Sequence, residues 1–291
     1  MELSPQEFDL LSHYIHSLCG IVISESKSYL IRQRLEPVVQ AAGCKSFGEF
    51  YDMVRQSRLP EIEQQIIDAI TTNETFFFRD GHPFITFKEH ILPELGTLVR
   101  RRKARHVSRK GPTVSLWSAG SSTGQEPYSL GMLIHEYALA NRHLNIYKED
   151  FGILATDVSS ACLSRAMAGE YTEMEIKRGL SADRMAGYFR KNEKRWVIDS
   201  HIREMIEFRQ INLIKPFSGL GGFDVILCRN VLIYFDNTTR KRMVNQLYDM
   251  LSDGGFLLLG ATENLYAITD TFESIHYGKT LLYRKPAKDT E

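Results

Sequence analysis

Apolar side chains recur every three or four positions through the first 80 residues, which is the spacing of amphipathic helices. Ser4 and Glu7 form a predicted capping box at the start of the first helix, and Gly20 is placed to end it. Three more periodic stretches follow before residue 71. Residues 1–80 are therefore predicted to form an all-α N-terminal domain.

From residue 112 onward the pattern changes, and short apolar runs alternate with helical segments. Four of these runs are predicted to be buried strands: TVSLWSA, FGILATD, FDVILCRN and GGFLLLG. Strands separated by helices indicate an α/β domain with a parallel, doubly wound sheet over residues 112–291. TLLYRK, near the end, is expected to add an edge strand. The stretch 195–213 breaks the alternation, so we expect a small β subdomain at about residues 190–210.

Residues 81–111 are expected to connect the two domains through a helix and a basic linker. Within them, RRRKARHVSRK (residues 100–110) is polar and has no periodic apolar positions. This run is predicted to be an exposed linker or the frayed end of a helix.

Charge and composition narrow the classes of function. The chain has 291 residues and a formal net charge of zero, which gives no general attraction to nucleic acid or to an anionic membrane. No apolar run approaches the roughly 20 residues that cross a bilayer, so direct membrane insertion is not expected. The first segment is amphipathic and carries acids, which is unlike an export signal. This pattern predicts a cytoplasmic protein. The four cysteines lack the spacing of a zinc site, and no metal is expected.

Unusual residues gather where the predicted strands end, and ligands of open α/β sheets bind at these carboxyl ends. Gly120 and Gly124 follow the first strand, Asp157 ends the second, and Arg229 and Asn230 follow the third. The glycine spacing differs from the dinucleotide fingerprint, and the acid comes later along the chain than in that fingerprint. We therefore favour an adenosine-type ligand over NAD, with a tight turn and a capping acid as the alternative.

The stretch TTNETFFFRD, residues 71–80, lies between the two domains. Its three successive phenylalanines cannot all face one side of a helix or strand. One interpretation is a hydrophobic hinge that docks the helical domain onto the sheet. A hinge does not account as well for the polar Asn73, Thr75 and Arg79.

Six long motifs, in order, resemble the chemotaxis receptor methyltransferase family. They are TTNETFFFR, SAGSSTGQEPYSL, LATDVSSACLSRAMAGEY, FRQINL, FDVILCRNVLIYFD and GGFLLLGATENL. The resemblance implies an all-α domain followed by a Rossmann-like methyltransferase domain with a small antiparallel β subdomain. It also implies S-adenosylmethionine as the methyl donor and S-adenosylhomocysteine as the product. The implied acceptors are glutamate side chains on the cytoplasmic methylation helices of chemotaxis receptors.

The same resemblance assigns roles to individual residues. It implies that the cofactor is bound by Asn73, Thr75, Arg79, Gly120, Glu126, Asp157, Asn212, Leu213, Arg229 and Asn230. Asp157 is expected at the ribose and Asn212 and Leu213 near the adenine, while Arg79 and Tyr234 are expected near the reacting methyl group. Each of two residues also has a structural alternative. Glu126 could compensate the positive end of a helix, and Tyr234 could be an aromatic residue packed at a strand end.

Receptor docking is suggested for Lys27, Arg32 and Arg34 by the family resemblance. A solvated helix face is the alternative for these charges. The bases of the linker offer another acidic-partner site: Arg100, Arg101, Arg102, Lys103, Arg105, Arg109 and Lys110. Family members that tether to a receptor tail carry a glycine-bearing insertion, and no glycine lies between Tyr188 and Glu207. Independence from such a tether is therefore predicted.

Three other functions were weighed. A nucleic-acid methyltransferase fits the basic linker, but Cys-Arg-Asn-Val stands where amino-group methyltransferases carry D-P-P-Y or N-P-P-Y. A cofactor-sensing adaptor without turnover is disfavoured by the intact Arg79, Asp157, Asn230 and Tyr234. A dehydrogenase is disfavoured by the absence of the dinucleotide fingerprint.

Overall fold

The computed structural model describes residues 1–57, 59–105, 111–217 and 219–287. The first domain is helical, as predicted, and its elements are α1 (Pro5–Cys19), η1 (Glu25–Lys27), α2 (Ser28–Ala41), α3 (Phe47–Ser57) and α4 (Pro60–Ile70). The capping box of Ser4 and Glu7 opens α1, and Gly20 ends it in the left-handed conformation with φ 76°. The core between these helices holds Leu11, Ile15, Ile31, Leu35, Phe47, Phe50 and Ile66.

An extended segment leads from α4 to α5 (His82–Thr86), η2 (Phe87–Ile91) and α6 (Leu92–Ala104). The first part of the basic run is therefore helical and partly paired, rather than an exposed linker. Arg102 forms a bidentate ion pair with Asp224 at 2.7 and 2.8 Å, and Lys103 pairs with Asp150 at 2.7 Å. Arg109 and Lys110 lie outside the described residues.

The second domain is built on a seven-stranded sheet in the order β6-β2-β1-β7-β8-β10-β9. Its strands are β1 (Val114–Ala119), β2 (Phe151–Asp157), β6 (Ile206–Gln210), β7 (Phe223–Cys228), β8 (Leu251–Leu259), β9 (Glu273–Tyr277) and β10 (Thr280–Arg284). The four predicted parallel strands are adjacent, whereas β10 runs antiparallel to β8. The expectation that TLLYRK forms an edge strand was wrong, because β9 pairs with β10 on its outer side.

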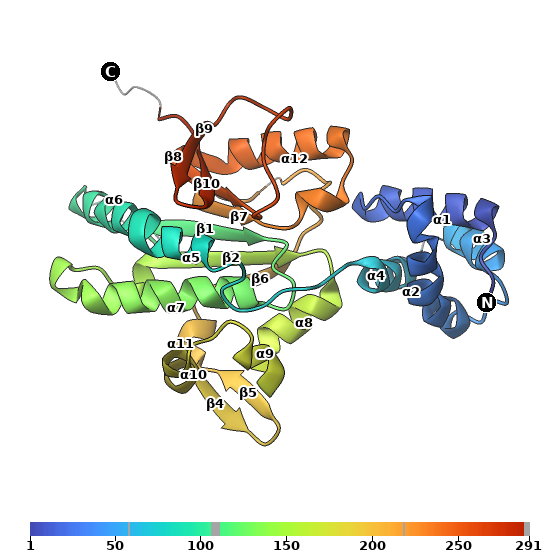
Figure 1. Ribbon diagram of the computed structural model, residues 1–291, viewed down its shortest axis with the longest axis horizontal. Coiled ribbons are helices and arrows are strands. Elements are labelled where there is room, and N and C mark those ends of the chain that lie inside the picture. The colour runs from blue at the N-terminus through green and yellow to red at the C-terminus, as the bar shows by residue number, and fades with distance from the viewer. Residues whose placement is uncertain (58, 106–110, 218, 288–291) are drawn as a thin grey trace.

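Helices cover both faces of this sheet (Figure 1). On one face, Val99 of α6 and Met132 of α7 (Gln125–Ala140) share a core with Leu116 of β1. On the other, Met243 and Leu247 of α12 (Asn237–Met250) share a core with other strand residues. The remaining elements around the sheet are η3 (Arg142–Leu144), η4 (Lys148–Asp150), α8 (Ser160–Ala168) and η5 (Leu232–Tyr234).

A separate three-stranded sheet, in the order β3-β5-β4, forms the small antiparallel subdomain. It comprises β3 (Glu170–Tyr171), β4 (Phe189–Asn192) and β5 (Arg195–Ile198), with the short helices α9 (Glu173–Lys177), α10 (Ala182–Tyr188) and α11 (Ser200–Arg203). The stretch expected to hold the insertion thus divides between two sheets, because β6 pairs in parallel with β2 of the main sheet.

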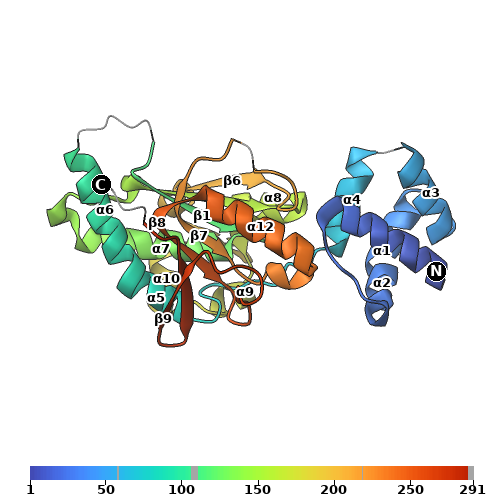
Figure 2. The same cartoon turned by 90° about the horizontal axis from the view of Figure 1, so that it is seen from above.

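The helical domain lies beyond the carboxyl ends of the parallel strands (Figures 1 and 2). Gln64 of α4 donates to the Val158 carbonyl oxygen at 3.1 Å, and Ser160 donates to Asp68 at 3.0 Å. On the opposite side, His16 of α1 contacts Asp236 at 2.9 Å. These contacts hold the first domain against the loops where ligands of α/β sheets bind.

Candidate active site

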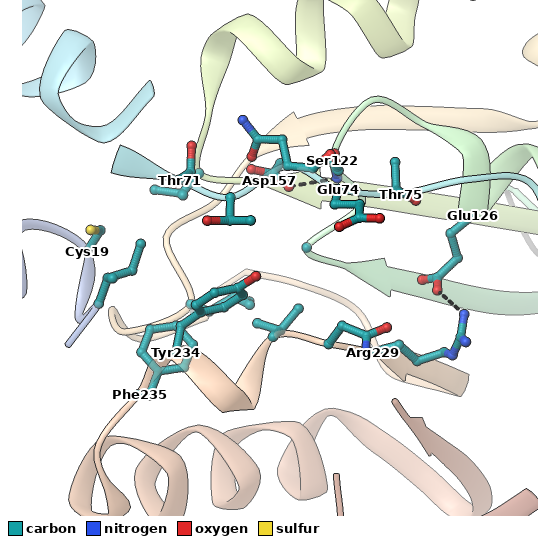
Figure 3. Close-up of a pocket in the computed structure, with 18 of the residues that line it drawn as sticks. Cys19, Thr71, Glu74, Thr75, Ser122, Glu126, Asp157, Arg229, Tyr234 and Phe235 are labelled. Carbon is teal, nitrogen blue, oxygen red and sulfur yellow. Dashed lines mark hydrogen bonds and ion pairs between the residues drawn. The ribbon is translucent and has the colours of Figure 1, made fainter. Parts of the chain in front are cut away.

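A pocket lies between the two domains, at the carboxyl ends of β1, β2, β6 and β7 (Figure 3). The chain order of the strands reverses between β1 and β7, which is where α/β sheets form ligand crevices. All eleven residues predicted for the cofactor and the reacting group line it. They are Asn73, Thr75, Arg79, Gly120, Glu126, Asp157, Asn212, Leu213, Arg229, Asn230 and Tyr234.

Two walls of this pocket come from different parts of the chain. We call the loops after β1, β2 and β7 the sheet wall; its lining residues are Gly120, Ser122, Glu126, Asp157, Arg229, Asn230 and Val231. We call the extended segment after α4 the linker wall; its lining residues are Thr71, Thr72, Asn73, Glu74, Thr75 and Arg79.

Gly120 begins the sheet wall with a close backbone approach. Its φ is 79°, and a Cβ atom there would lie 2.5 Å from a Val231 methyl group. The amides of Gly120 and Ser121 both donate to the Thr156 carbonyl oxygen, at 2.8 and 2.9 Å. Glycine is thus required at this turn by both conformation and space.

Asp157 is held by backbone donors on either side. Its two carboxylate oxygens accept hydrogen bonds from the amides of Ser122 at 2.7 Å and Ser159 at 2.9 Å. The residue is only 9% exposed. Burial raises the pKa of Asp157, and the backbone donors oppose that shift. The fixed carboxylate retains lone pairs for ligand hydroxyl groups.

Arg229 joins the sheet wall to the end of the linker wall. Its side chain is 1% exposed and donates to Glu126 at 2.9 Å, to Asp80 at 2.8 Å and to the Arg79 carbonyl oxygen at 2.9 Å. Glu126 also accepts from the Ser118 hydroxyl at 2.8 Å. Both terminal nitrogens of Arg229 are therefore used to hold neighbouring residues in place.

The linker wall is held largely through its backbone carbonyl oxygens. The Ser122 hydroxyl donates to the Asn73 carbonyl oxygen at 2.9 Å, and Arg79 donates to the Glu74 carbonyl oxygen at 2.7 Å. The Glu74 carboxylate pairs with Arg178 of the small subdomain at 2.8 Å, with both side chains more than half exposed.

The three phenylalanines point to three different places. Phe77 is fully buried and its ring packs edge-on against Tyr171, with centroids 5.0 Å apart. The Phe78 ring packs against Phe84 at 5.3 Å, and the Phe76 ring lies 4.2 Å from the Arg178 guanidinium. These partners lie in the small subdomain and on α5, so the rings fix the segment to the second domain and do not dock the helical domain as the hinge interpretation expected. The polar residues beside them line the pocket.

The remaining side of the pocket is largely apolar. It includes Ile21, Ile211, Leu213 and Phe235, together with the Cys19 thiol, whose pKa burial raises to about 11. The Tyr234 ring extends from η5 with its hydroxyl toward the pocket (Figure 3).

The Asn212 side chain connects the pocket to the helical domain. Its side-chain amide donates to the Leu18 carbonyl oxygen at 2.7 Å and so ties this side of the pocket to α1.

Glu263 was not predicted from the sequence. This buried carboxylate follows β8 and accepts hydrogen bonds from the amides of Asn230 at 2.6 Å, Val231 at 2.9 Å and Gly260 at 2.7 Å. It fixes the loop after β7, where Asn230 has a φ of 58°. An acid just after a predicted strand was the available signal.

Left-handed backbone conformations gather around this pocket. Phe78, Asp80, Ser122 and Asn230 all have positive φ values, between 51° and 71°. Such conformations cost about 1–3 kcal/mol each in non-glycine residues and persist where the surrounding structure enforces them. Their clustering indicates a functional site.

The predicted docking residues differ in accessibility. Lys27 and Arg32 are exposed, on η1 and α2. Arg34 is half-buried and donates to the carbonyl oxygens of Ile70 and Thr71. Lys27 and Arg32 therefore face solvent, whereas Arg34 does not.

The chemistry of the lining suits S-adenosylmethionine. Buried carboxylates match a ribose diol and an amino group, cations match a carboxylate, and the apolar side matches an adenine ring. Arg229 Nε and Asn230 Oδ1 are buried without a hydrogen-bond partner in the described part of the chain. They offer one donor and one acceptor to a polar ligand. Among the described residues, no group of three or more His, Cys, Asp or Glu side chains is placed to hold a metal ion.

Comparison with known proteins agrees with the fold. Residues 6–71 match the all-alpha domain of CheR methyltransferases, and residues 73–280 match their S-adenosylmethionine-binding domain. The chain is thus an S-adenosylmethionine-dependent methyltransferase. It belongs to the CheR methyltransferase family, which confirms the family predicted from the motifs.

Relatives match over nearly the whole chain. Chemotaxis protein methyltransferase 1 of Pseudomonas aeruginosa is 37% identical over 98% of this chain and 99% of its own length. Chemotaxis protein methyltransferase Cher2 of Pseudomonas putida is 36% identical, with 96% and 97% covered. A chemotaxis protein methyltransferase of Vibrio anguillarum is 37% identical, with 97% and 98% covered. In the described residues, no helix is long and apolar enough to span a membrane.

Proposed function

We propose that this enzyme transfers the methyl group of S-adenosylmethionine to glutamate side chains of chemotaxis receptors, forming methyl esters in sensory adaptation. The observation that carries the proposal is the convergence of the eleven predicted residues on one pocket between the domains. The names of the relatives, which are chemotaxis protein methyltransferases, support this acceptor class.

The cofactor would be held mainly by the sheet wall. Asp157 is assigned to the ribose hydroxyls and Glu126 to the amino group, because both are buried carboxylates beside strand ends. Leu213 and the backbone at Asn212 are assigned to the adenine. Asn73 and Thr75 approach from the linker wall, and Gly120 lets the ligand reach the backbone.

The reaction depends more on the positions of the acceptor and the methyl group than on acid or base catalysis. When bound, S-adenosylmethionine supplies an electrophilic methyl group on a sulfonium. A glutamate acceptor, with a reference pKa of about 4.3, is already ionised at neutral pH, so the enzyme has no proton to remove. Its residues must exclude water and hold the acceptor oxygen in line with the methyl group.

Arg79 is assigned to orient the acceptor carboxylate. Its side chain lines the pocket and is held by the Glu74 carbonyl oxygen at 2.7 Å. Too strong a grip on the ground state would slow attack, so orientation rather than tight binding is its role. Tyr234, from the opposite side, is assigned to orient the acceptor or the methyl group.

The receptor is proposed to dock on the helical domain, residues 1–80, through Lys27 and Arg32. Both are exposed cations, and receptor methylation helices carry acidic positions. The enzyme is proposed to bind the receptor in the cytoplasm.

In the proposed division of the chain, residues 81–111 connect the helical domain to the methyltransferase domain, residues 112–291.

Independence from a receptor tail peptide is also proposed. The β4–β5 hairpin of the small subdomain turns through Glu193 and Lys194 alone, with Asn192 opposite Arg195. Such a short connection supports the predicted lack of a tethering insertion. Specific, tight binding of an isolated receptor tail peptide in calorimetry would contradict this part of the proposal.

The central experiment is methyl transfer from labelled S-adenosylmethionine to bacterial membranes that contain chemotaxis receptors. Label on receptor bands that alkali releases as volatile methanol is the expected result, since methyl esters are base-labile. Cofactor binding without such label would overturn the receptor-glutamate acceptor, and absence of cofactor binding would overturn the assignment of the pocket.

A further inference from the structure

Arg34 links the helix that carries the docking cations to the linker wall. It lies on α2, and its guanidinium reaches the end of α4. The nitrogen Nη1 lies 2.7 Å from the Ile70 carbonyl oxygen, 3.1 Å from that of Thr71 and 3.3 Å from the Thr72 hydroxyl. Two hydrogens on this nitrogen are shared among three acceptors.

The end of α4 is where such a cation has the greatest effect. The last carbonyl groups of a helix lack partners within the helix and carry its partial negative charge. Ile70 is the last residue of α4, and Thr71 is extended, with ψ 142°. Arg34 therefore binds the chain at the residue where it leaves the helix and becomes the linker wall.

The bound residues are also pocket residues. Thr71 and Thr72 line the pocket, as do the next three residues, Asn73, Glu74 and Thr75. From the sheet side, the Ser122 hydroxyl holds the Asn73 carbonyl oxygen at 2.9 Å. The linker wall is thus anchored at one end by a residue of the first domain and near its middle by a residue of the second.

We propose that Arg34 is a positioning residue of the cofactor site and not a receptor-docking cation. By binding Ile70, Thr71 and Thr72 it sets the course of the segment that brings Asn73 and Thr75 to the ligand. Arg32, two positions away on the same helix, is exposed and stays available for docking. The proposal rests on the assignment of this pocket to S-adenosylmethionine.

The test measures the affinity of the full chain for S-adenosylhomocysteine by calorimetry, with no receptor present. We expect Arg34→Ala to weaken binding about tenfold, which corresponds to about 1.4 kcal/mol. Arg34→Lys is expected to lie between, because an ammonium can bond to the carbonyl oxygens without the span of a guanidinium. Gln33→Ala, at the exposed neighbouring position, is the matched control and should bind as the unchanged chain does.

Circular dichroism and thermal unfolding establish that each variant is folded before its affinity is compared. Where Arg34→Ala does not fold, Arg34→Lys carries the test, with weakened binding by a protein of unchanged secondary structure as the supporting result. Methyl transfer to receptor membranes supplies a second readout, since Arg32→Ala should raise the KM for receptor and leave S-adenosylhomocysteine affinity unchanged.

Unchanged affinity in both Arg34 variants, together with a raised KM for receptor, would make Arg34 a docking residue and overturn the proposal. A failure of the unchanged chain to bind S-adenosylhomocysteine would instead overturn the cofactor assignment, and this proposal with it. The two failures are therefore distinguishable.

Discussion

The sheet wall and the linker wall of the pocket are built in different ways. In the sheet wall, the Arg229 side chain is 1% exposed, the Glu126 side chain is 11% exposed and Asp157 is buried, and each makes at least two hydrogen bonds. In the linker wall, the Glu74 side chain is 60% exposed and its Arg178 partner 52%. The sheet wall consists mainly of buried, mutually paired groups, whereas the linker wall carries exposed charges and is anchored by Arg34 of the first domain and Ser122 of the second.

Because of this difference, substitutions in the two walls are expected to change different properties of the enzyme. Buried, mutually paired charges are costly to disturb, because removing one leaves the others unpaired in a poorly solvated place. Exposed pairs contribute little to stability. Changes in the sheet wall should therefore affect folding and cofactor affinity, while changes in the linker wall should affect turnover more than folding.

The largest effect is expected from Arg229→Met. This change leaves Glu126 and Asp80 without their shared cation, and we expect a loss of about 3–5 kcal/mol in unfolding free energy. Urea unfolding measures it. Arg209→Ala, which breaks an exposed pair with Glu207, is the control and should change stability by less than about 0.5 kcal/mol. A loss in Arg229→Met as small as that of the control would contradict the description of the sheet wall.

Arg79→Ala is expected to lower turnover about a hundredfold, because the acceptor carboxylate loses its orientation. Affinity for S-adenosylhomocysteine should stay within about threefold of the unchanged chain, since Asn73, Thr75 and Asp157, which are assigned to the cofactor, are unchanged. Turnover on receptor membranes and calorimetry with the product measure the two effects. Unchanged turnover would remove Arg79 from the reaction.

Asp157→Asn tests the proposed ribose contact. A hydrogen bond to a charged group contributes about 1.5–3 kcal/mol, so affinity for S-adenosylhomocysteine should fall by about one to two orders of magnitude. The matched measurement uses an analogue without the ribose hydroxyls. The substitution should weaken binding of that analogue much less, and equal losses for both ligands would place Asp157 away from the ribose.

The raised pKa of Asp157 gives binding and folding opposite responses to pH. Its ordinary value is 3.8, and burial raises the pKa in the folded chain. The ionised carboxylate is the form assigned to the ligand, so affinity should fall as the pH drops through the raised pKa. The contribution of this group to stability of the free enzyme is instead fully present below 3.8 and is lost as the pH rises through the folded pKa. Calorimetry and urea unfolding over an acidic pH series measure both trends, and both should flatten in Asp157→Asn.

The smallest effect is expected from Glu74→Gln in the linker wall. Its ion pair with Arg178 is exposed, so we expect no measurable shift in the urea midpoint. A clear shift would mean that the linker wall contributes to folding, and the contrast between the two walls would fail.

Strand-end chemistry was predictable from the sequence because it follows from local pattern and a general rule of α/β sheets. Asp157, Arg229 and Asn230 directly follow or end apolar runs, and such ends meet at one edge. Glu263 was missed because its function, accepting amides of a loop about thirty residues earlier in the chain, exists only once β7 and β8 pair.

Other differences arise from tertiary contacts in the same way. Arg34 looked like a surface cation because its partners, Ile70 to Thr72, lie on another helix and the segment after it. The edge strand β9 was missed because ESIHY is short and polar, and its pairing with β10 alone makes it a strand. Within the basic run, Arg102 and Lys103 find their acidic partners more than forty residues away.

The linker wall runs through the point where the two matched domains meet, between Thr71 and Asn73. A chimaera joined at that boundary would take Thr71 and Thr72 from one parent and the rest of the linker wall from another, so one pocket wall would be assembled from two sequences. Chimaeras that exchange the two domains should therefore be joined elsewhere than at this boundary.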